Sequence, residues 1–188
     1  ARTYDSDASE GELALRRVLT PAAKYWVCKR LPHAMAEAME VTGGAGYVEE
    51  GPFGRLFRES PLNSIWEGSG NVMCIDVLRA FARGPQCRDA LADEWQAARG
   101  QQAAFDAALD ATLALLQRPQ QDGDEFAARH LAERIALLTQ ASLLIRHAPE
   151  PVAAGFCATR LAGGWRGTLG TVALPQARAL IDRALVEA

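Results

Sequence analysis

The sequence lacks the features that mark membrane and secreted proteins. No apolar run in its 188 residues approaches the ~20 residues that a helix needs to span a bilayer. The first seven residues, ARTYDSD, do not show the basic and then apolar pattern of a secretory signal. We therefore expect no membrane association and a cytoplasmic location.

Cysteine and histidine are scarce and scattered. The four cysteines form no C-x-x-C pair, and the three histidines are isolated, so the spacing predicts no metal site. Four cysteines in 188 residues are also too few for a disulfide scaffold, which favours buried, reduced thiols. The cysteines are Cys28, Cys74, Cys87 and Cys157.

Positive charge is not in excess. The 20 basic and 23 acidic residues give a net charge of -3, so the whole chain has no basic field to attract nucleic acid. The composition, 49% hydrophobic and 23% charged, is typical of a globular protein.

Alternating β-branched residues, the pattern of strands, are almost absent. Ala, Leu, Arg, Glu and Gln dominate and are good helix formers, so the sequence predicts an all-α fold. Thr20 and Pro21 have the pattern of a helix start, and Pro32 should kink or split the helix that follows. The predicted helices are 10–19, 21–41, 54–59, 71–83, 85–98, 101–116, 124–147, 151–162 and 174–186.

The dipeptide Gly84-Pro85 is a strong break and the predicted domain boundary. It divides the chain into residues 1–83 and 84–188, the second of a size typical of a separate domain.

A glycine cluster at residues 43–46 follows a predicted helix. It lacks the third glycine of a dinucleotide-binding fingerprint, and no strand precedes it, so a Rossmann site is excluded. Two interpretations remain open. The cluster is a plain helix end and turn, or it lets the backbone approach a phosphate or ring closely.

A second cluster, residues 55–71, gathers charge, amide, indole, hydroxyl and glycine. Gly68-Ser69-Gly70 leads into a helix whose first N–H groups are free to bind an anion, unless Ser69 or Asn71 caps them. Glu67 lies beside Trp66, where it is either a desolvated general base or an ordinary surface carboxylate. No G-x-S-x-G elbow is present, which argues against hydrolase chemistry.

Three blocks occur in order in these clusters: EVTGGAGY (40–47), RLFRE (55–59) and IWEGS (65–69). Together they resemble the C-terminal helical domain of the acyl-CoA dehydrogenase family. Residues 21–30 and 64–79 are similar to its AidB-like branch, flavoproteins linked to the bacterial response to DNA alkylation. The resemblance is strong over 12–83 and weaker beyond. Glu40 stands where most members have Gln, and Ser69 where they have Thr.

The resemblance implies a helical bundle followed by an additional C-terminal helical domain, in a fragment that lacks the family's N-terminal and β-domains. It implies FAD as cofactor, an acyl-CoA substrate, a homo-oligomer (a tetramer), and Glu67 as the catalytic base that removes the substrate's α-proton. We expect the fragment alone to be inactive and not to hold FAD tightly. The glycine cluster matches a loop against the flavin of a partner subunit. The implied cofactor-binding residues are Gly43, Gly44, Gly46, Ile65, Trp66, Gly68, Ser69, Gly70, Asn71 and Ile75.

The alternative is a DNA-binding or oligomerisation module of an alkylation-response flavoprotein. Residues 84–188 carry ten Arg, no Lys and twelve acidic residues, a net charge of -2, which is weak support for double-stranded DNA as a partner. A local patch of arginines would be needed, and four lie late in the chain. These are Arg160, Arg166, Arg178 and Arg183.

Overall fold

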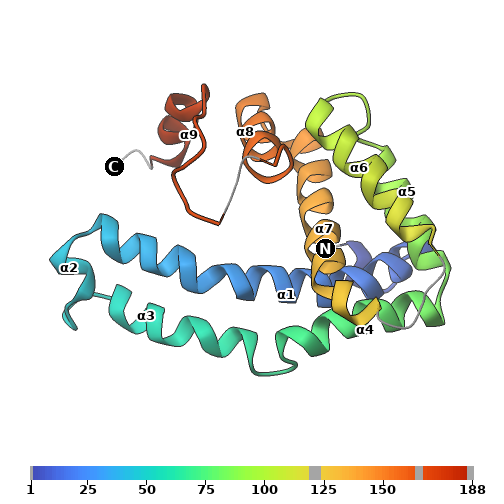
Figure 1. Ribbon diagram of the computed structural model, residues 1–188, viewed down its shortest axis with the longest axis horizontal. Coiled ribbons are helices and arrows are strands. Elements are labelled where there is room, and N and C mark those ends of the chain that lie inside the picture. The colour runs from blue at the N-terminus through green and yellow to red at the C-terminus, as the bar shows by residue number, and fades with distance from the viewer. Residues whose placement is uncertain (1, 119–123, 164–166, 186–188) are drawn as a thin grey trace. The chain divides into compact units, whose positions relative to one another are not determined.

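The computed structural model describes residues 2–118, 124–163 and 167–185 (Figure 1). Its regular structure is helical, with no strand in these ranges, which confirms the predicted all-α fold. The elements are η1 (Arg2–Tyr4), α1 (Glu10–Val41), α2 (Gly44–Tyr47), α3 (Phe53–Glu59), η2 (Ser60–Ser64), α4 (Gly70–Arg83), α5 (Gln86–Gln96), α6 (Ala103–Leu116), α7 (Asp124–His147), α8 (Glu150–Arg160) and α9 (Ala177–Ala184). The helix predicted over 174–186 is shorter than expected, and its predicted end at Val186 lies outside the described residues.

Helix α1 is one continuous helix of 32 residues where the sequence predicts two. A capping box starts it: the Ser9 Oγ accepts from the Glu12 N–H, and the Glu12 carboxylate accepts from the Ser9 N–H. Thr20 is not an N-cap, because its Oγ1 donates to the Arg16 carbonyl oxygen within the helix (2.8 Å). The predicted boundary at Thr20 is therefore wrong, and the helix is not split at Pro32.

Packing explains how α1 tolerates Pro21 in its interior. A proline there removes a backbone donor and costs about 3 kcal/mol in a free helix. Pro21 is buried, as are its neighbours Val18 and Ala22, because α1 contacts α3, η2 and α4 along its length. The burial of Pro21 offsets the free-energy cost of a proline inside the helix. Helix propensities of single residues do not include such tertiary burial.

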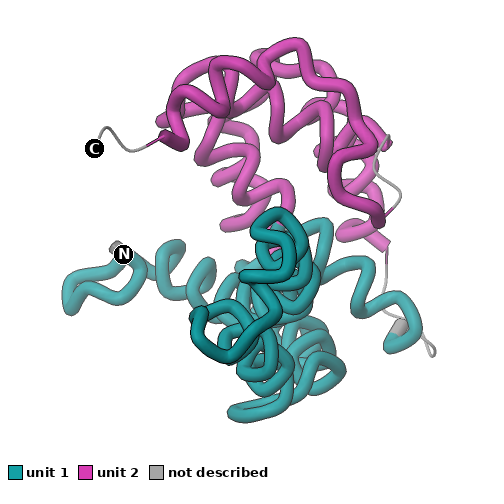
Figure 2. Tube along the Cα trace, turned by 90° about the vertical axis from the view of Figure 1, so that its left-hand side faces the viewer, with its two compact units in different colours: residues 1–87, 120–136 teal, residues 88–119, 137–188 magenta. Residues whose placement is uncertain are grey.

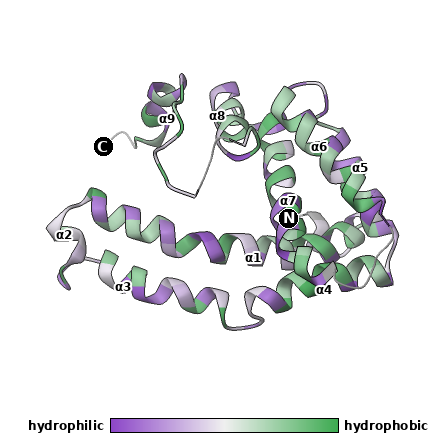
Figure 3. Cartoon of the chain, in the orientation of Figure 1, coloured by the Kyte–Doolittle hydropathy of each residue, from purple (hydrophilic) through white to green (hydrophobic). Residues whose placement is uncertain are grey.

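The chain forms two compact units (Figure 2). Unit 1 comprises residues 1–87 and 120–136, and unit 2 comprises residues 88–119 and 137–188. The two domains predicted from the sequence, 1–83 and 84–188, stay a prediction. Within both units the helices mix hydrophobic and hydrophilic positions (Figure 3), as expected for helices with one buried face.

Unit 1 is built on the packing of α1 against α4. Val18 and Ala22 of α1 are fully buried, and Cys74 and Val77 of α4 are at most 1% exposed. Burial raises the pKa of the Cys74 thiol to about 11, so this thiol stays protonated and unreactive. No disulfide forms among the described residues, where three of the four cysteines are buried and Cys28 is half-buried.

Unit 2 has its own core of Trp95, Phe105, Leu109 and Leu138, all fully buried. The Trp95 Nε1 donates to the Thr139 Oγ1 at 3.0 Å, which satisfies the buried indole. A second polar contact joins α5 and α7: Arg146 forms an ion pair with Glu94. Unit 2 is thus a separate packed helical body.

Candidate functional site

The predicted site centres on a tight turn between η2 and α4. Glu67 has φ = 51° and Gly68 has φ = 114°, so two consecutive residues adopt left-handed backbone. In the described part of the chain, Glu67 is the one non-glycine residue with a positive φ. Such a conformation is disfavoured by ~1–2 kcal/mol for residues with a Cβ and persists only where the surroundings impose it.

Lys24, from the middle of α1, holds this turn. Its Nζ donates to the Trp66 carbonyl oxygen at 2.8 Å and also to the Gly68 carbonyl oxygen. The two acceptors flank Glu67 in sequence. Sequence reasoning missed Lys24, although its rarity, as one of two lysines in the chain, was a visible signal.

An open pocket of about 460 Å³ lies beside Glu67. Arg16, Arg17 and Lys24 supply positive charge, and Asp76 and Glu67 negative charge. The other lining residues are Tyr4, Thr20, Pro21 and Met73. The Tyr4 hydroxyl lies 2.7 Å from the Thr20 Oγ1, and the Arg16 guanidinium lies 5.3 Å from the Tyr4 ring centroid. The pocket wall is therefore built mainly from one face of α1.

The side chain of Glu67 is exposed, as are those of Ile65 (64%) and Trp66 (55%). The described residues of this chain do not desolvate the carboxylate, so within the chain Glu67 has the environment of a surface residue. The large apolar side chains of Ile65 and Trp66 beside it are also exposed to solvent. The surface around Glu67 can thus receive a large apolar ligand or another protein surface.

The first turn of α4 follows directly. Ser69 occupies the N-cap position, but its side chain makes no capping hydrogen bond. Asn71 does not cap the helix either, since its Oδ1 accepts from the Arg129 Nε of α7 at 2.7 Å. The capping alternative is therefore wrong for both side chains. Ile75, half-buried, lies one turn further along α4.

Glycines 43, 44 and 46 lie in the turn and short helix α2 beyond the end of α1. Gly43, with φ = 61°, ends α1 as a helix-terminating glycine. Gly46 has no room for a side chain: a Cβ there would lie 2.1 Å from the Thr42 Oγ1 and 2.3 Å from the Met39 carbonyl oxygen. The helix-end interpretation of the cluster is thus confirmed within this chain.

The predicted cofactor site has two parts, the Glu67 turn and the glycine cluster at 43–46, which lie near different parts of α1. Lys24, which holds the Glu67 turn, and Val41, the last residue of α1 before the glycine cluster, are 17 positions apart, which is about 26 Å at a rise of 1.5 Å per residue. Contact of these glycines with the flavin of a second subunit stays a prediction.

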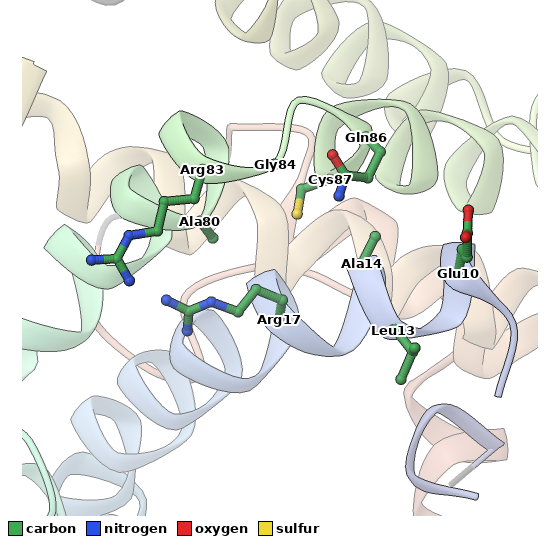
Figure 4. A pocket seen from close by; sticks show the side chains of 9 residues that line it. All are labelled: Glu10, Leu13, Ala14, Arg17, Ala80, Arg83, Gly84, Gln86 and Cys87. Carbon is green, nitrogen blue, oxygen red and sulfur yellow. The ribbon is translucent and has the colours of Figure 1, made fainter. Parts of the chain in front are cut away.

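A further open pocket of about 530 Å³ lies where α1 meets the end of α4 (Figure 4). Arg17 and Arg83 lie on one side of it and Glu10 on the other. Arg17 is already paired with Asp76 at 2.9 Å, and no residue of the predicted site lines this pocket. It therefore adds nothing to the predicted chemistry.

Comparisons with known proteins show the family to which the chain belongs. The family described as acyl-CoA dehydrogenase, C-terminal domain, matches residues 2–82. AidB of Escherichia coli is 39% identical over 161 residues, which cover 86% of this chain and 29% of AidB.

Two solved structures share the fold. ACDH-11 of Caenorhabditis elegans, solved in complex with C11-CoA, has a TM-score of 0.66 and 28% identity, over 78% of this chain and 28% of its own. The apo form of Bd2924 has a TM-score of 0.61 and 34% identity, over 76% of this chain and 26% of its own.

The chain belongs to the acyl-CoA dehydrogenase family, with residues 2–82 matching that family's C-terminal domain. Within the family it is similar to AidB, as the motifs at 21–30 and 64–79 indicate. It spans 29% of the length of AidB and 28% of that of ACDH-11.

Two further properties concern metals and membranes. Among the described residues, no three His, Cys, Asp or Glu side chains gather closely enough to hold a metal ion. No helix in the described ranges is both long and apolar enough to cross a bilayer.

Proposed function

We propose that this chain supplies the catalytic base and one wall of the flavin site of an AidB-like acyl-CoA dehydrogenase. The observation that carries the proposal is the placement of Glu67. It lies in the region that matches the family, on a strained turn, with its carboxylate exposed beside an open pocket. A fixed, accessible carboxylate is what removal of a proton from a bound substrate requires.

In this proposal the Glu67 carboxylate takes the α-proton of an acyl-CoA thioester. The electron pair of the broken α C–H bond forms the new bond between the α- and β-carbons. A bound FAD supplies the acceptor for the hydride that leaves the β-carbon. Closure of the site around substrate would exclude water from Glu67, which the isolated chain leaves exposed.

The residues around the turn fit a flavin as one wall of its site. Ile65 and Trp66 offer exposed apolar surface for a ring, and the uncapped N–H groups at the start of α4 offer donors to its polar edge. Ser69 adds an exposed hydroxyl. At Gly68 and Gly70 a Cβ would meet the side chains of Met73 and Lys29, so glycine leaves room for both at this turn. Gly43, Gly44 and Gly46 would contact the flavin of a second subunit.

A homo-oligomer, a tetramer by resemblance, is part of the proposal. Unit 1 exposes several large apolar side chains on and after α1, which favours a covering partner over solvent. These include Val27, Val41, Tyr47 and Val48. An acyl-CoA is the proposed substrate, and ACDH-11, the relative solved with C11-CoA, supports that class of ligand.

A location in the bacterial cytoplasm, and a role in the response to DNA alkylation, are proposed from the AidB-like resemblance. Direct DNA binding is not favoured. Of the four late arginines, Arg178 is paired with Asp182 at 3.0 Å, and Arg166 lies outside the described residues. The net charge of -2 over 84–188 adds no general attraction for phosphates.

The proposal is tested with Glu67→Gln in the intact protein that carries this chain. Turnover of acyl-CoA with an electron acceptor should fall by ~10²–10⁴-fold, because a general base contributes that much. The flavin content should be unchanged. The matched control is Glu37→Gln, an exposed glutamate on α1 that should keep full activity. Full turnover by Glu67→Gln would show that the base lies elsewhere.

A further inference from the structure

The side chain of Lys24 bridges two backbone carbonyls across the turn that carries Glu67. Lys24 is half-buried in the middle of α1, and its ammonium donates to the carbonyl oxygens of Trp66 and Gly68. An ammonium group has three donors on a flexible stem, which suits it to bind two convergent carbonyls. Helix α1 thus holds the residues on either side of Glu67.

Few other polar contacts hold this turn. Before it, the Trp66 N–H donates to the Leu62 carbonyl oxygen at 3.1 Å, and after it the Met73 N–H donates to the Ser69 carbonyl oxygen at 3.0 Å. Between these two bonds, in the described part of the chain, the hydrogen bonds from Lys24 are the ones that reach the carbonyls of residues 66 and 68.

The backbone of the turn needs such support. Glu67 at φ = 51° and Gly68 at φ = 114° form a left-handed pair, and only the second is a glycine. A glutamate adopts this region rarely and returns to negative φ when nothing opposes it. A change in φ at residue 67 would redirect its side chain, because the Cβ leaves the backbone at that residue.

We infer that Lys24 is a positioning residue, which fixes the direction of the Glu67 carboxylate by binding the carbonyls on both sides of it. The inference rests on the proposed role of Glu67 as base. A base acts only within hydrogen-bond reach of the proton it removes, so a displaced turn lowers the rate without removing the carboxylate. Lys24 itself does not contact the substrate in this account.

The first test measures the turn directly, without catalysis. A glutamate-specific protease cuts after Glu67 only when the turn opens, so the cutting rate follows the open population. In the intact protein, Lys24→Met should raise the rate of cutting after Glu67 at least about tenfold. Cutting after Glu37, within α1, should be unchanged. His33→Met, at an exposed position further along α1, is the matched control and should leave both rates unchanged.

A second variant is needed in case Lys24→Met unfolds the whole protein. If Lys24→Met accelerates cutting at both sites, the comparison passes to Lys24→Gln, which keeps a polar side chain but is one bond shorter and uncharged. It should give the selective rise after Glu67. Equal cutting after Glu67 in wild type and in a folded Lys24 variant would overturn the inference, and so would a rise at both sites for Lys24→Gln.

The kinetic readout separates positioning from simple stability. For the folded Lys24 variant, kcat for an acyl-CoA should fall about 10- to 100-fold, while KM stays within about threefold and flavin content is unchanged. A selective rise in cutting with an unchanged kcat would overturn the positioning role. Full activity in Glu67→Gln would instead contradict the proposed function, whatever the cutting rates show for Lys24.

Discussion

Arg17 of α1 and Asp76 of α4 form a two-point ion pair, with nitrogen–oxygen distances of 2.9 and 3.0 Å. The pair joins the two helices that carry Lys24 and the end of the Glu67 turn. The hydrogen bonds that the Arg17 guanidinium donates to the Asp76 carboxylate raise its pKa further above its already high value, so the arginine stays charged. The pair thus fixes the register of α1 against α4 beside the candidate site.

Removal of this pair should cost modest stability. Arg17→Met and Asp76→Asn should couple by about 0.5–1 kcal/mol in a double-mutant cycle, because both side chains are partly exposed and screened by water. Urea unfolding of the four proteins measures the coupling. A coupling energy near zero would show that the pair does not hold the helices together.

Gly46 offers a sharper test of packing. Gly46→Ala should destabilise the protein by ~1–3 kcal/mol, since the new Cβ would meet the Met39 carbonyl oxygen, a backbone atom that cannot move aside cheaply. Gly44→Ala is the matched control, because open space surrounds that position and its φ is not positive. Thermal melting should separate the two variants, and equal melting temperatures would contradict the packing account.

The thiols should differ in reactivity. Burial raises the pKa of Cys74 and of Cys157 to about 11, so at pH 8 each is almost entirely protonated as well as covered. Cys28 is half-buried and should react first with a thiol reagent. Labelling of Cys74 and Cys157 should rise as the pH approaches 11 or as the protein unfolds. In Cys28→Ser, fast labelling at pH 8 should be lost, and its persistence would contradict the assignment.

The isolated chain should bind FAD weakly. It offers one wall of the proposed site, and its glycine cluster follows the C-terminal end of α1, while Lys24 in the middle of α1 holds the Glu67 turn. Titration of FAD followed by fluorescence should give a dissociation constant weaker than about 1 μM, which corresponds to about -8 kcal/mol. Tighter binding would mean that this chain holds a complete flavin site.

DNA binding should also be weak. With a net charge of -2 over residues 84–188, we expect a dissociation constant above ~10⁻⁶ M for duplex DNA at physiological salt. A salt series on this chain and on the intact protein measures it. Tight binding by the chain with a log–log salt slope steeper than about -4 would require at least four phosphate contacts and would contradict the expectation.

The sequence predicted elements whose signals are local. The helix predicted over 124–147 agrees with α7 at both ends, and the short helix predicted over 54–59 agrees with α3 to within one residue. The glycine turn at 43–46 was also predicted. These features depend on caps, breakers and helix formers within a few residues.

Contacts between distant residues could not be predicted in the same way. Pro21 looked like a helix start because its burial against neighbouring helices is invisible to a local rule. Lys24 and Trp66 are 42 residues apart, and Arg129 and Asn71 are 58 apart, so no local sequence rule predicts either contact. The family resemblance located Glu67, but only the fold revealed its left-handed backbone and the lysine that holds it.

The most direct test of the account is the exchange of substrate α-hydrogens for deuterium. The intact protein is incubated with an acyl-CoA in D₂O, and incorporation at the α-carbon is followed by mass spectrometry. This readout reports proton removal itself, independently of any electron acceptor. The account predicts that Glu67→Gln lowers the exchange rate by ~10²–10⁴-fold while Glu37→Gln leaves it unchanged. Exchange at the wild-type rate in Glu67→Gln would contradict the assignment of Glu67 as the base.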